Sequence, residues 1–194
     1  MDGDLERAGD QWKLRFTREL LHPPEKVWRA ITEPRHLEAW FPQRIIGEWV
    51  VGAPLTFEAR GGEHPAFAGE VLAWDPPSLL EFRWGTDVIR FEIKPHENGA
   101  TAGCTFVLTD AFDELGKAAR DSAGWHTCLD YLEHHLNGTT PPWETGPGTG
   151  HVHDRARRRW SEVHAGYVEK FGEAASAIGP PVQVNAASAI GPHV

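Results

Sequence analysis

The fold is decided by residues 23–42, which read PPEKVWRAITEPRHLEAWFP. Two prolines open a short helix at positions where a missing backbone N–H is harmless. Pro34 ends that helix and begins another, because a proline disfavours helical dihedrals at the residue before it. The second helix ends in the apolar pair Trp40 and Phe41. Two helices of this length cannot bury a core by themselves, so they are expected to pack on a larger body formed by the rest of the chain.

That body is predicted to be an antiparallel sheet. Apolar and charged residues alternate along several segments, which is typical of strands with one buried and one solvated face. Short turns join the segments, and the pair Asn98-Gly99 is a good hairpin turn. The expected strands cover residues 11–20, 45–51, 54–59, 67–74, 80–84, 89–94 and 104–108.

A long helix is predicted over residues 117–137, and it would cover the apolar side of the sheet. Its apolar residues recur at helical spacing on one stripe, and Asn137-Gly138 is a typical helix end. A sheet with one helix laid across its apolar face is an α+β domain. A further helix, from about residue 153, carries an aromatic stripe that is expected to pack back on this domain.

We expect four segments along the chain. These are an N-terminal arm at residues 1–10, the sheet-and-helix domain at 11–138, a loop with an additional helix at 139–172, and a tail at 173–194. The tail repeats the sequence AASAIGP at 174–180 and 186–192. Two copies of seven residues cannot build a repeat fold. The tail is therefore predicted to be flexible, with a docking motif as the alternative.

Composition restricts the class of protein. A net charge of −9 argues against a nucleic-acid-binding surface. The basic run at residues 155–159 is interpreted as a solvated helix face, with a phosphate-binding patch as the alternative. The two cysteines lack a paired spacing and are expected to be reduced. Neither a leader nor an apolar segment of membrane-spanning length is recognised, so we expect a cytoplasmic protein without membrane insertion.

Four of these motifs together resemble one family. They are PEKVW at 24–28, WFP at 40–42, DPP before LEFRW at 75–84, and GWH at 124–126. Their order and spacing are similar to those of single-domain bacterial relatives of the activator of the 90-kilodalton heat-shock chaperone ATPase. That group lies within the START or birch-pollen-allergen-like (SRPBCC) superfamily, and the resemblance covers about residues 11–171.

The resemblance implies a helix-grip fold. In that fold a curved antiparallel sheet wraps around the long C-terminal helix, and two short helices close one end of a cavity. The cavity often holds an apolar or amphipathic ligand. Eukaryotic activators carry an additional N-terminal domain that contacts the chaperone, and a first strand near residue 11 leaves no room for one in this chain.

Ten apolar residues are expected on the inward face, where they either fill the core or line a ligand pocket. They are Trp40, Phe41, Leu80, Phe82, Trp84, Phe91, Phe106, Leu108, Trp125 and Leu129. Three ionisable residues are candidates for catalysis: Asp110, His126 and Glu70. A carboxyl group in an apolar cavity has a raised pKa, and a histidine beside it would suit proton transfer.

The sequence gives little support for a metal site, a cofactor site or a catalytic nucleophile. The cluster His151-Val152-His153-Asp154 has no third ligand at zinc-like spacing, so no metal site is predicted. Asp154 is better interpreted as a helix N-cap. Phosphate-loop, dinucleotide and nucleophile-elbow motifs are missing, so no cofactor is predicted.

Three functions remain open. The favoured one is binding of a small apolar or amphipathic molecule between the sheet and the long helix. The second is a protein-interaction module of the chaperone-activator kind, with a chaperone as partner and a role in the stress response. The third is a cyclase or hydratase type of enzyme that acts on an enclosed aromatic or polyketide-like substrate. It requires an inward-facing ionisable pair such as Asp110 with His126.

Overall fold

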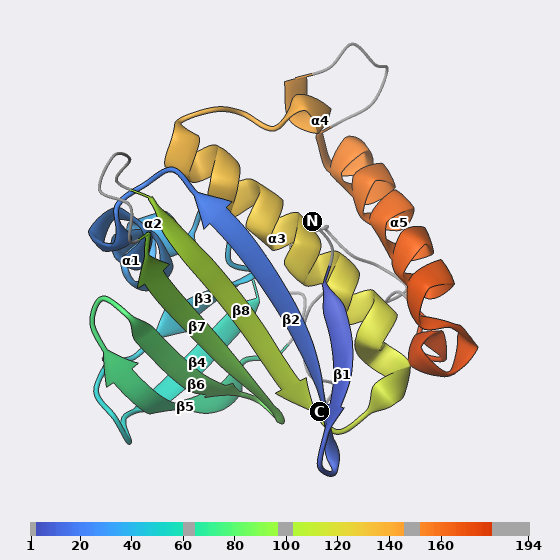
Figure 1. The fold of residues 1–194 in the computed structure, drawn as a ribbon, viewed down its shortest axis with the longest axis horizontal. Coiled ribbons are helices and arrows are strands. Elements are labelled where there is room, and N and C mark those ends of the chain that lie inside the picture. Colours follow the sequence, from blue (N-terminus) through green and yellow to red (C-terminus); the bar gives the residue numbers. More distant parts are fainter. Residues whose placement is uncertain (1–2, 60–64, 97–102, 146–151, 180–194) are drawn as a thin grey trace.

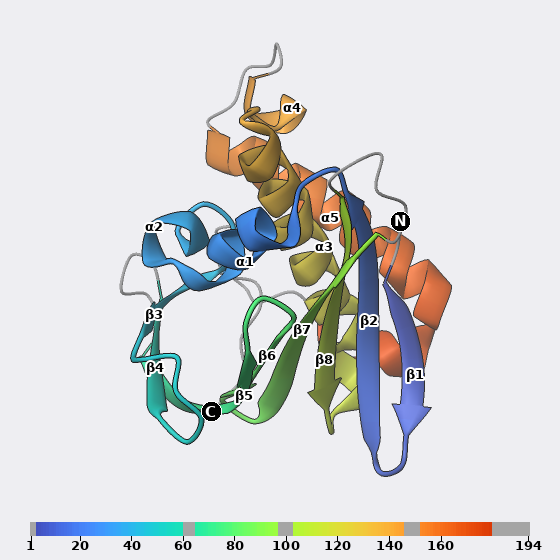
Figure 2. The same cartoon turned by 60° about the vertical axis from the view of Figure 1, so that its left-hand side comes forward.

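The computed structural model describes residues 3–59, 65–96, 103–145 and 152–179. Within them, eight strands form one antiparallel sheet in the order β1-β2-β8-β7-β6-β5-β4-β3. Figure 2 shows that the sheet curls from β1 and β2 round to β3 and β4. The strands are β1 (Asp4–Ala8), β2 (Gln11–Leu20), β3 (Gln43–Ile46), β4 (Pro54–Ala59), β5 (Phe67–Asp75), β6 (Leu79–Trp84), β7 (Asp87–Pro95) and β8 (Cys104–Phe112).

Helices cover the inner face of the sheet and one of its ends. The long helix α3 (Ala118–Asn137) follows the 3₁₀ turn η1 (Leu115–Lys117) and crosses the inner face, with α5 (Val152–Phe171) along its outer side (Figure 1). The short helices α1 (Pro24–Thr32) and α2 (Pro34–Leu37) join β2 to β3 and lie at one end (Figure 2). The remaining elements are α4 (Pro142–Thr145) and the 3₁₀ turn η2 (Glu173–Ser176).

This architecture confirms the predicted α+β helix-grip fold. The helix expected over residues 117–137 is α3, and it ends where Gly138 adopts a left-handed φ of 65°. Of the described residues, no helix is both long enough and apolar enough to cross a membrane.

One predicted strand is shorter than expected. The segment 45–51 was predicted as a strand, but β3 ends at Ile46. Gly47, with φ of +145°, breaks the extended chain. The indole N–H of Trp49 then donates to the carbonyl oxygen of Thr32 at 2.9 Å. This tertiary contact turns the segment toward the short helices, so its apolar residues do not extend the sheet.

Both ends of the described chain pack on the domain. Residues 4–8, expected in an N-terminal arm, pair with β2 as strand β1. The backbone N–H of Gly3 donates to the hydroxyl oxygen of Tyr167 at 2.7 Å. At the other end, Ala175 is buried and the N–H of Ile178 donates to the carbonyl of Gly116 at 3.0 Å. The second copy of AASAIGP lies outside the described residues.

Candidate functional site

Aromatic side chains gather between the sheet and α3. The ten residues predicted for the inward face are all buried, with exposed fractions of 0–2%. Phe41 lies at the centre of this cluster. Its ring centroid is 5.9–6.4 Å from the centroids of Phe57, Phe82, Trp84 and Trp125. The four rings belong to β4, β6 and α3, whereas Phe41 comes from the segment after α2.

The pair of short helices α1 and α2 closes one end of this interior. Trp40 belongs to the pair, because its indole N–H donates to the carbonyl of Ala30 in α1 at 2.9 Å. Its ring contacts Phe91 of the sheet, with centroids 5.9 Å apart. Trp28 of α1 packs on Trp74 of β5 at 4.8 Å between centroids. Aromatic contacts therefore hold the helix pair against the sheet.

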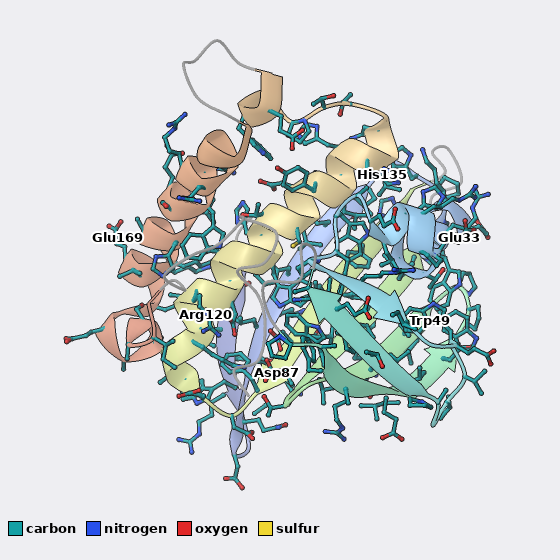
Figure 3. All side chains as sticks on the ribbon, turned by 180° about the vertical axis from the view of Figure 1, so that it is seen from behind. Glu33, Trp49, Asp87, Arg120, His135 and Glu169 are labelled. Carbon is teal, nitrogen blue, oxygen red and sulfur yellow. The ribbon has the colours of Figure 1, made fainter. Side chains whose placement is uncertain are left out.

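Polar contacts fasten the same helix pair to the C-terminal end of α3. Lys26 Nζ donates to the carbonyl of Leu136 at 2.7 Å. Nδ1 of His36 lies 2.9 Å from Nε2 of His135. Figure 3 labels His135 and Glu33 at this end of the molecule. A hydrogen bond between two imidazoles needs one N–H and one bare nitrogen, so it is lost when both rings are protonated. Burial lowers the pKa of His135, and His36 and Lys26 lower it further.

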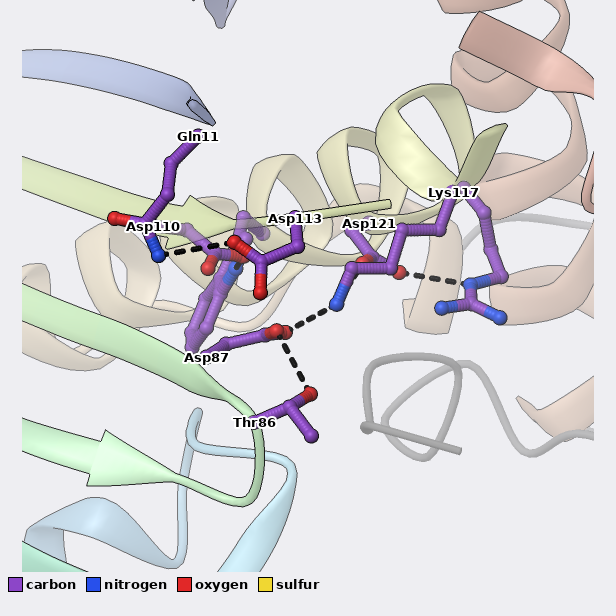
Figure 4. A network of polar contacts seen from close by, with 9 residues as sticks. Gln11, Thr86, Asp87, Asp110, Asp113, Lys117 and Asp121 are labelled. Atoms are coloured by element: carbon purple, nitrogen blue, oxygen red, sulfur yellow. Dashed lines mark hydrogen bonds and ion pairs between the residues drawn. The ribbon is translucent and has the colours of Figure 1, made fainter. Parts of the chain in front are cut away.

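A buried charged cluster lies at the opposite end of α3 (Figure 4). Lys117 Nζ is 2.5 Å from Asp87 Oδ2 and 3.7 Å from Asp121 Oδ2. Arg120 Nε donates to Asp121 Oδ1 at 2.7 Å. Each of these four side chains belongs to a residue that is at most 5% exposed. Burial acts to lower the pKa of Lys117, but the surrounding carboxylates outweigh burial and raise it.

Asp110 joins this cluster to the aromatic interior. Its Oδ2 accepts a hydrogen bond from the indole N–H of Trp125 at 2.8 Å. Its Oδ1 has no hydrogen-bond partner among the described residues. Burial raises the pKa of Asp110 well above its ordinary value, and the charges of Asp87 and Asp121 raise it further. With Asp110 protonated, two carboxylates face two cations, and the buried cluster is neutral.

Three carboxylates close together also suggest a cation site. Oxygens of Asp87, Asp110 and Asp121 lie within 4.8 Å of one another. The ammonium group of Lys117 contacts two of these carboxylates and supplies the positive charge that they need. The geometry therefore supports a buried ion-pair cluster, in which Lys117 takes the role that a metal ion would have.

The structure does not bring the three catalytic candidates together. Glu70 is exposed on β5. His126 faces α5, where its Nδ1 lies 3.0 Å from the hydroxyl of Tyr167 and its Nε2 3.7 Å from Asp130. Asp110 faces the sheet side of α3. The ionisable pair that the enzyme hypothesis requires is therefore not formed by Asp110 and His126.

His126 instead contributes to a surface groove between α3 and α5. The groove has a volume of about 510 Å³. It is lined by His126, Arg159, Glu162, Val163, Tyr167 and Lys170, among others. On α5, Trp160, Val163 and Tyr167 are buried against the domain. The groove carries charges of both signs, and nothing in its lining favours one class of ligand.

Sequence reasoning missed the ion-pair cluster, although two signals for it were present. Asp87 continues the inward alternation of Ile89 and Phe91, and Lys117 and Asp121 have the i, i+4 spacing of a helical ion pair.

Trp84 was predicted inward, but its indole N–H is buried without a hydrogen-bond partner among the described residues. That feature cannot be seen before the strands are assembled.

Solved structures with the same fold are found in several bacteria. The conserved protein of unknown function EF2215 from Enterococcus faecalis is 20% identical, with a TM-score of 0.64 over 87% of this chain and 90% of that chain. CalU16 from Micromonospora echinospora is 18% identical, with a TM-score of 0.60 over 86% and 94%. Protein MLL2253 from Mesorhizobium loti is 24% identical, with a TM-score of 0.55 over 66% and 99%. No curated protein matches this chain.

These structural similarities establish the fold alone, because all three identities are low. The family follows from the sequence match. Residues 21–137, more than half of the chain, match the family described as Activator of Hsp90 ATPase homolog 1-like protein. The matched region runs from the residue after β2 to the last residue of α3. The resemblance predicted from the motifs is thereby confirmed, and the chain belongs to the Activator of Hsp90 ATPase homolog 1-like family.

Proposed function

We propose that the protein binds a small apolar or amphipathic molecule in the interior between the sheet and α3. The observation that carries this proposal is a set of buried polar atoms that lack hydrogen-bond partners. Oδ1 of Asp110, Nε1 of Trp84 and Oγ of Ser122 have no hydrogen-bond partner among the described residues. All three residues are 0% exposed. Most buried polar atoms in proteins are hydrogen-bonded, and a polar group on a ligand would supply the missing partners.

The helix pair offers a route to this interior. The opposite end is closed by the ion-pair cluster, where separation of Lys117 from Asp87 would leave buried charges unpaired. The helix pair is held by aromatic contacts and by a few hydrogen bonds, which are less costly to break. We infer that a ligand enters when α1 and α2 move away from the C-terminal end of α3.

Native mass spectrometry of the gently purified protein tests the proposal, together with titration by a fluorescent apolar probe. A mass excess that denaturation releases, or saturable probe binding that an apolar competitor reverses, is the expected result. The variant Glu70→Gln serves as a control. Glu70 is exposed, so this substitution should leave binding unchanged. A clean apo mass together with non-saturable probe binding would refute the proposal.

A chaperone-directed role is a second proposal, and it rests on family membership alone. It predicts that the purified chain stimulates the ATPase of the cognate 90-kilodalton chaperone. Lack of any complex at micromolar concentrations would exclude this role.

The stability of the helix pair is expected to depend on pH through His135. Its pKa is lowered in the folded state, so between that pKa and the ordinary value of 6.5 the unfolded chain binds a proton that the folded chain does not. The free energy of unfolding should therefore rise with pH through this window and level off above it. Glu33, 3.6 Å from Nε2 of His36, and Lys26 are the other charges at the pair.

His135→Gln should flatten this rise, because glutamine can hydrogen-bond without titrating. At pH 8 we expect the variant to lie within about 1 kcal/mol of the wild type. Urea unfolding between pH 5 and 8 measures both effects. An unchanged pH slope in the variant would show that His135 is not the titrating group.

A further inference from the structure

We propose that Phe41 occupies the place of an aromatic ring of the ligand, and that this ligand is an uncharged aromatic molecule with a hydrogen-bond acceptor for the indole N–H of Trp84. The inference rests on the proposed function and adds a ligand class to it.

The environment of Phe41 is a chamber for one aromatic ring. Phe82 and Trp84 meet its ring at 63° and 66°, and both centroids lie 6.2 Å away. The rings of Phe57 and Trp125 are tilted by 37° and 53° relative to it. Edge-to-face and tilted contacts at these distances are the favourable geometries for aromatic pairs. The chamber therefore recognises a planar ring, and any planar ring of similar size can make the same contacts.

Phe41 enters this chamber from outside it. The chamber walls are strands of the sheet and α3, whereas Phe41 follows α2. Its neighbour Trp40 is bonded to the helix pair, because its indole N–H donates to the carbonyl of Ala30. Movement of the pair away from α3 would withdraw the ring and leave an apolar cavity. Such cavities in proteins stay dry and bind benzene-sized molecules. Phe41 and the ligand therefore compete for one position.

Trp84 adds the polar part of the specificity. Its indole N–H is buried without a partner among the described residues, and its ring contacts Phe41. A phenyl ring cannot accept this hydrogen bond well, so a carbonyl, ether or hydroxyl oxygen on the ligand would gain it on binding. An anionic ligand would lose its hydration in the apolar chamber, which favours an uncharged ligand.

Acetophenone and ethylbenzene form a suitable probe pair, because they have similar shape and differ in one carbonyl group. We expect the wild type to bind acetophenone about tenfold more tightly than ethylbenzene. NMR titration of the indole N–H signals gives a direct readout, and the Trp84 signal is identified by its absence in Trp84→Phe. Acetophenone should shift that signal, and Trp84→Phe should abolish the tenfold preference.

Two cavity-forming variants test the role of Phe41. Phe41→Ala should tighten binding of both probes, because the competing ring is gone, and should keep the preference for acetophenone. Phe106→Ala removes an equally buried ring from β8 and is the matched control. It leaves Phe41 and Trp84 in place, so it should keep the wild-type preference for acetophenone and should not tighten binding at the Trp84 site. Phe41→Leu replaces Phe41→Ala if the latter does not fold.

The outcomes separate this inference from the function on which it rests. Equal binding of both probes to the wild type, with no effect of Trp84→Phe, would overturn the acceptor class and leave interior binding intact. Probe binding to Phe41→Ala but not to the wild type would show that Phe41 is a permanent core residue, which overturns the inference. No binding of these probes or of the fluorescent apolar probe to any variant would refute interior binding itself.

Discussion

Lys117→Met is expected to lower the free energy of unfolding by about 3–5 kcal/mol, because it leaves the buried carboxylate of Asp87 without its cation. Lys117 contacts Asp87 and Asp121, and all three residues are at most 5% exposed. Methionine fills a similar volume, so lost packing contributes little. Chemical denaturation at pH 7 measures the loss.

A second substitution shows whether the loss is electrostatic. Asp87→Asn in the Lys117→Met background removes the charge that has lost its cation and should recover part of the stability, since Asp121 keeps its ion pair with Arg120. Lys170→Met is the matched control, because Lys170 pairs with Asp4 at the surface, where the two side chains are 38% and 80% exposed. It should change stability by less than about 1 kcal/mol. Equal losses for the two lysine variants would contradict an ion-pair role for the cluster.

The fold could be predicted because its signals are local. Alternation along the strands, prolines at the starts of α1 and α2, and the glycine after α3 each depend on a few neighbouring residues. The strand predicted at 45–51 was too long because Trp49 forms its hydrogen bond with Thr32, which lies in another element. A local pattern cannot report a contact of that kind.

The candidate site was less predictable, because it depends on how four elements meet. Asp87 lies on β7, Asp110 on β8, Lys117 in η1 and Asp121 on α3. Consecutive residues of a helix point about 100° apart, so Trp125 faces the sheet while His126 faces α5. This rotation explains why Asp110 bonds to Trp125 and not to the histidine beside it. The helical spacing shows that Trp125 and His126 face different directions. Which of the two faces the sheet becomes clear only once the position of the sheet relative to α3 is known.

Two substitutions of Asp110 are expected to change the stability in opposite directions. Alanine should lower the free energy of unfolding, and asparagine should raise it at pH 7. Asp110→Ala removes the acceptor for the indole N–H of Trp125, and leaving a buried donor unpaired costs about 1–3 kcal/mol, in addition to the void that the missing carboxyl leaves. Asp110→Asn keeps the shape and the acceptor oxygen. It also resembles the protonated acid, which is the form that burial favours in the folded protein.

The comparison of Asp110→Asn with the wild type should depend on pH in a defined direction. The folded-state pKa of Asp110 is raised, so above the ordinary value of 3.8 the folded protein holds a proton that the unfolded chain has released. The stability of the wild type then falls, relative to the asparagine variant, by up to about 1.4 kcal/mol for each pH unit until the folded-state pKa is passed. Urea unfolding of both proteins from pH 4 to 8 measures this difference. The two proteins should be closest near pH 4, and the asparagine variant should be the more stable one at pH 7. A constant difference across this range would mean that Asp110 is ionised in the folded state, and the buried cluster would then carry a net negative charge beside the aromatic interior.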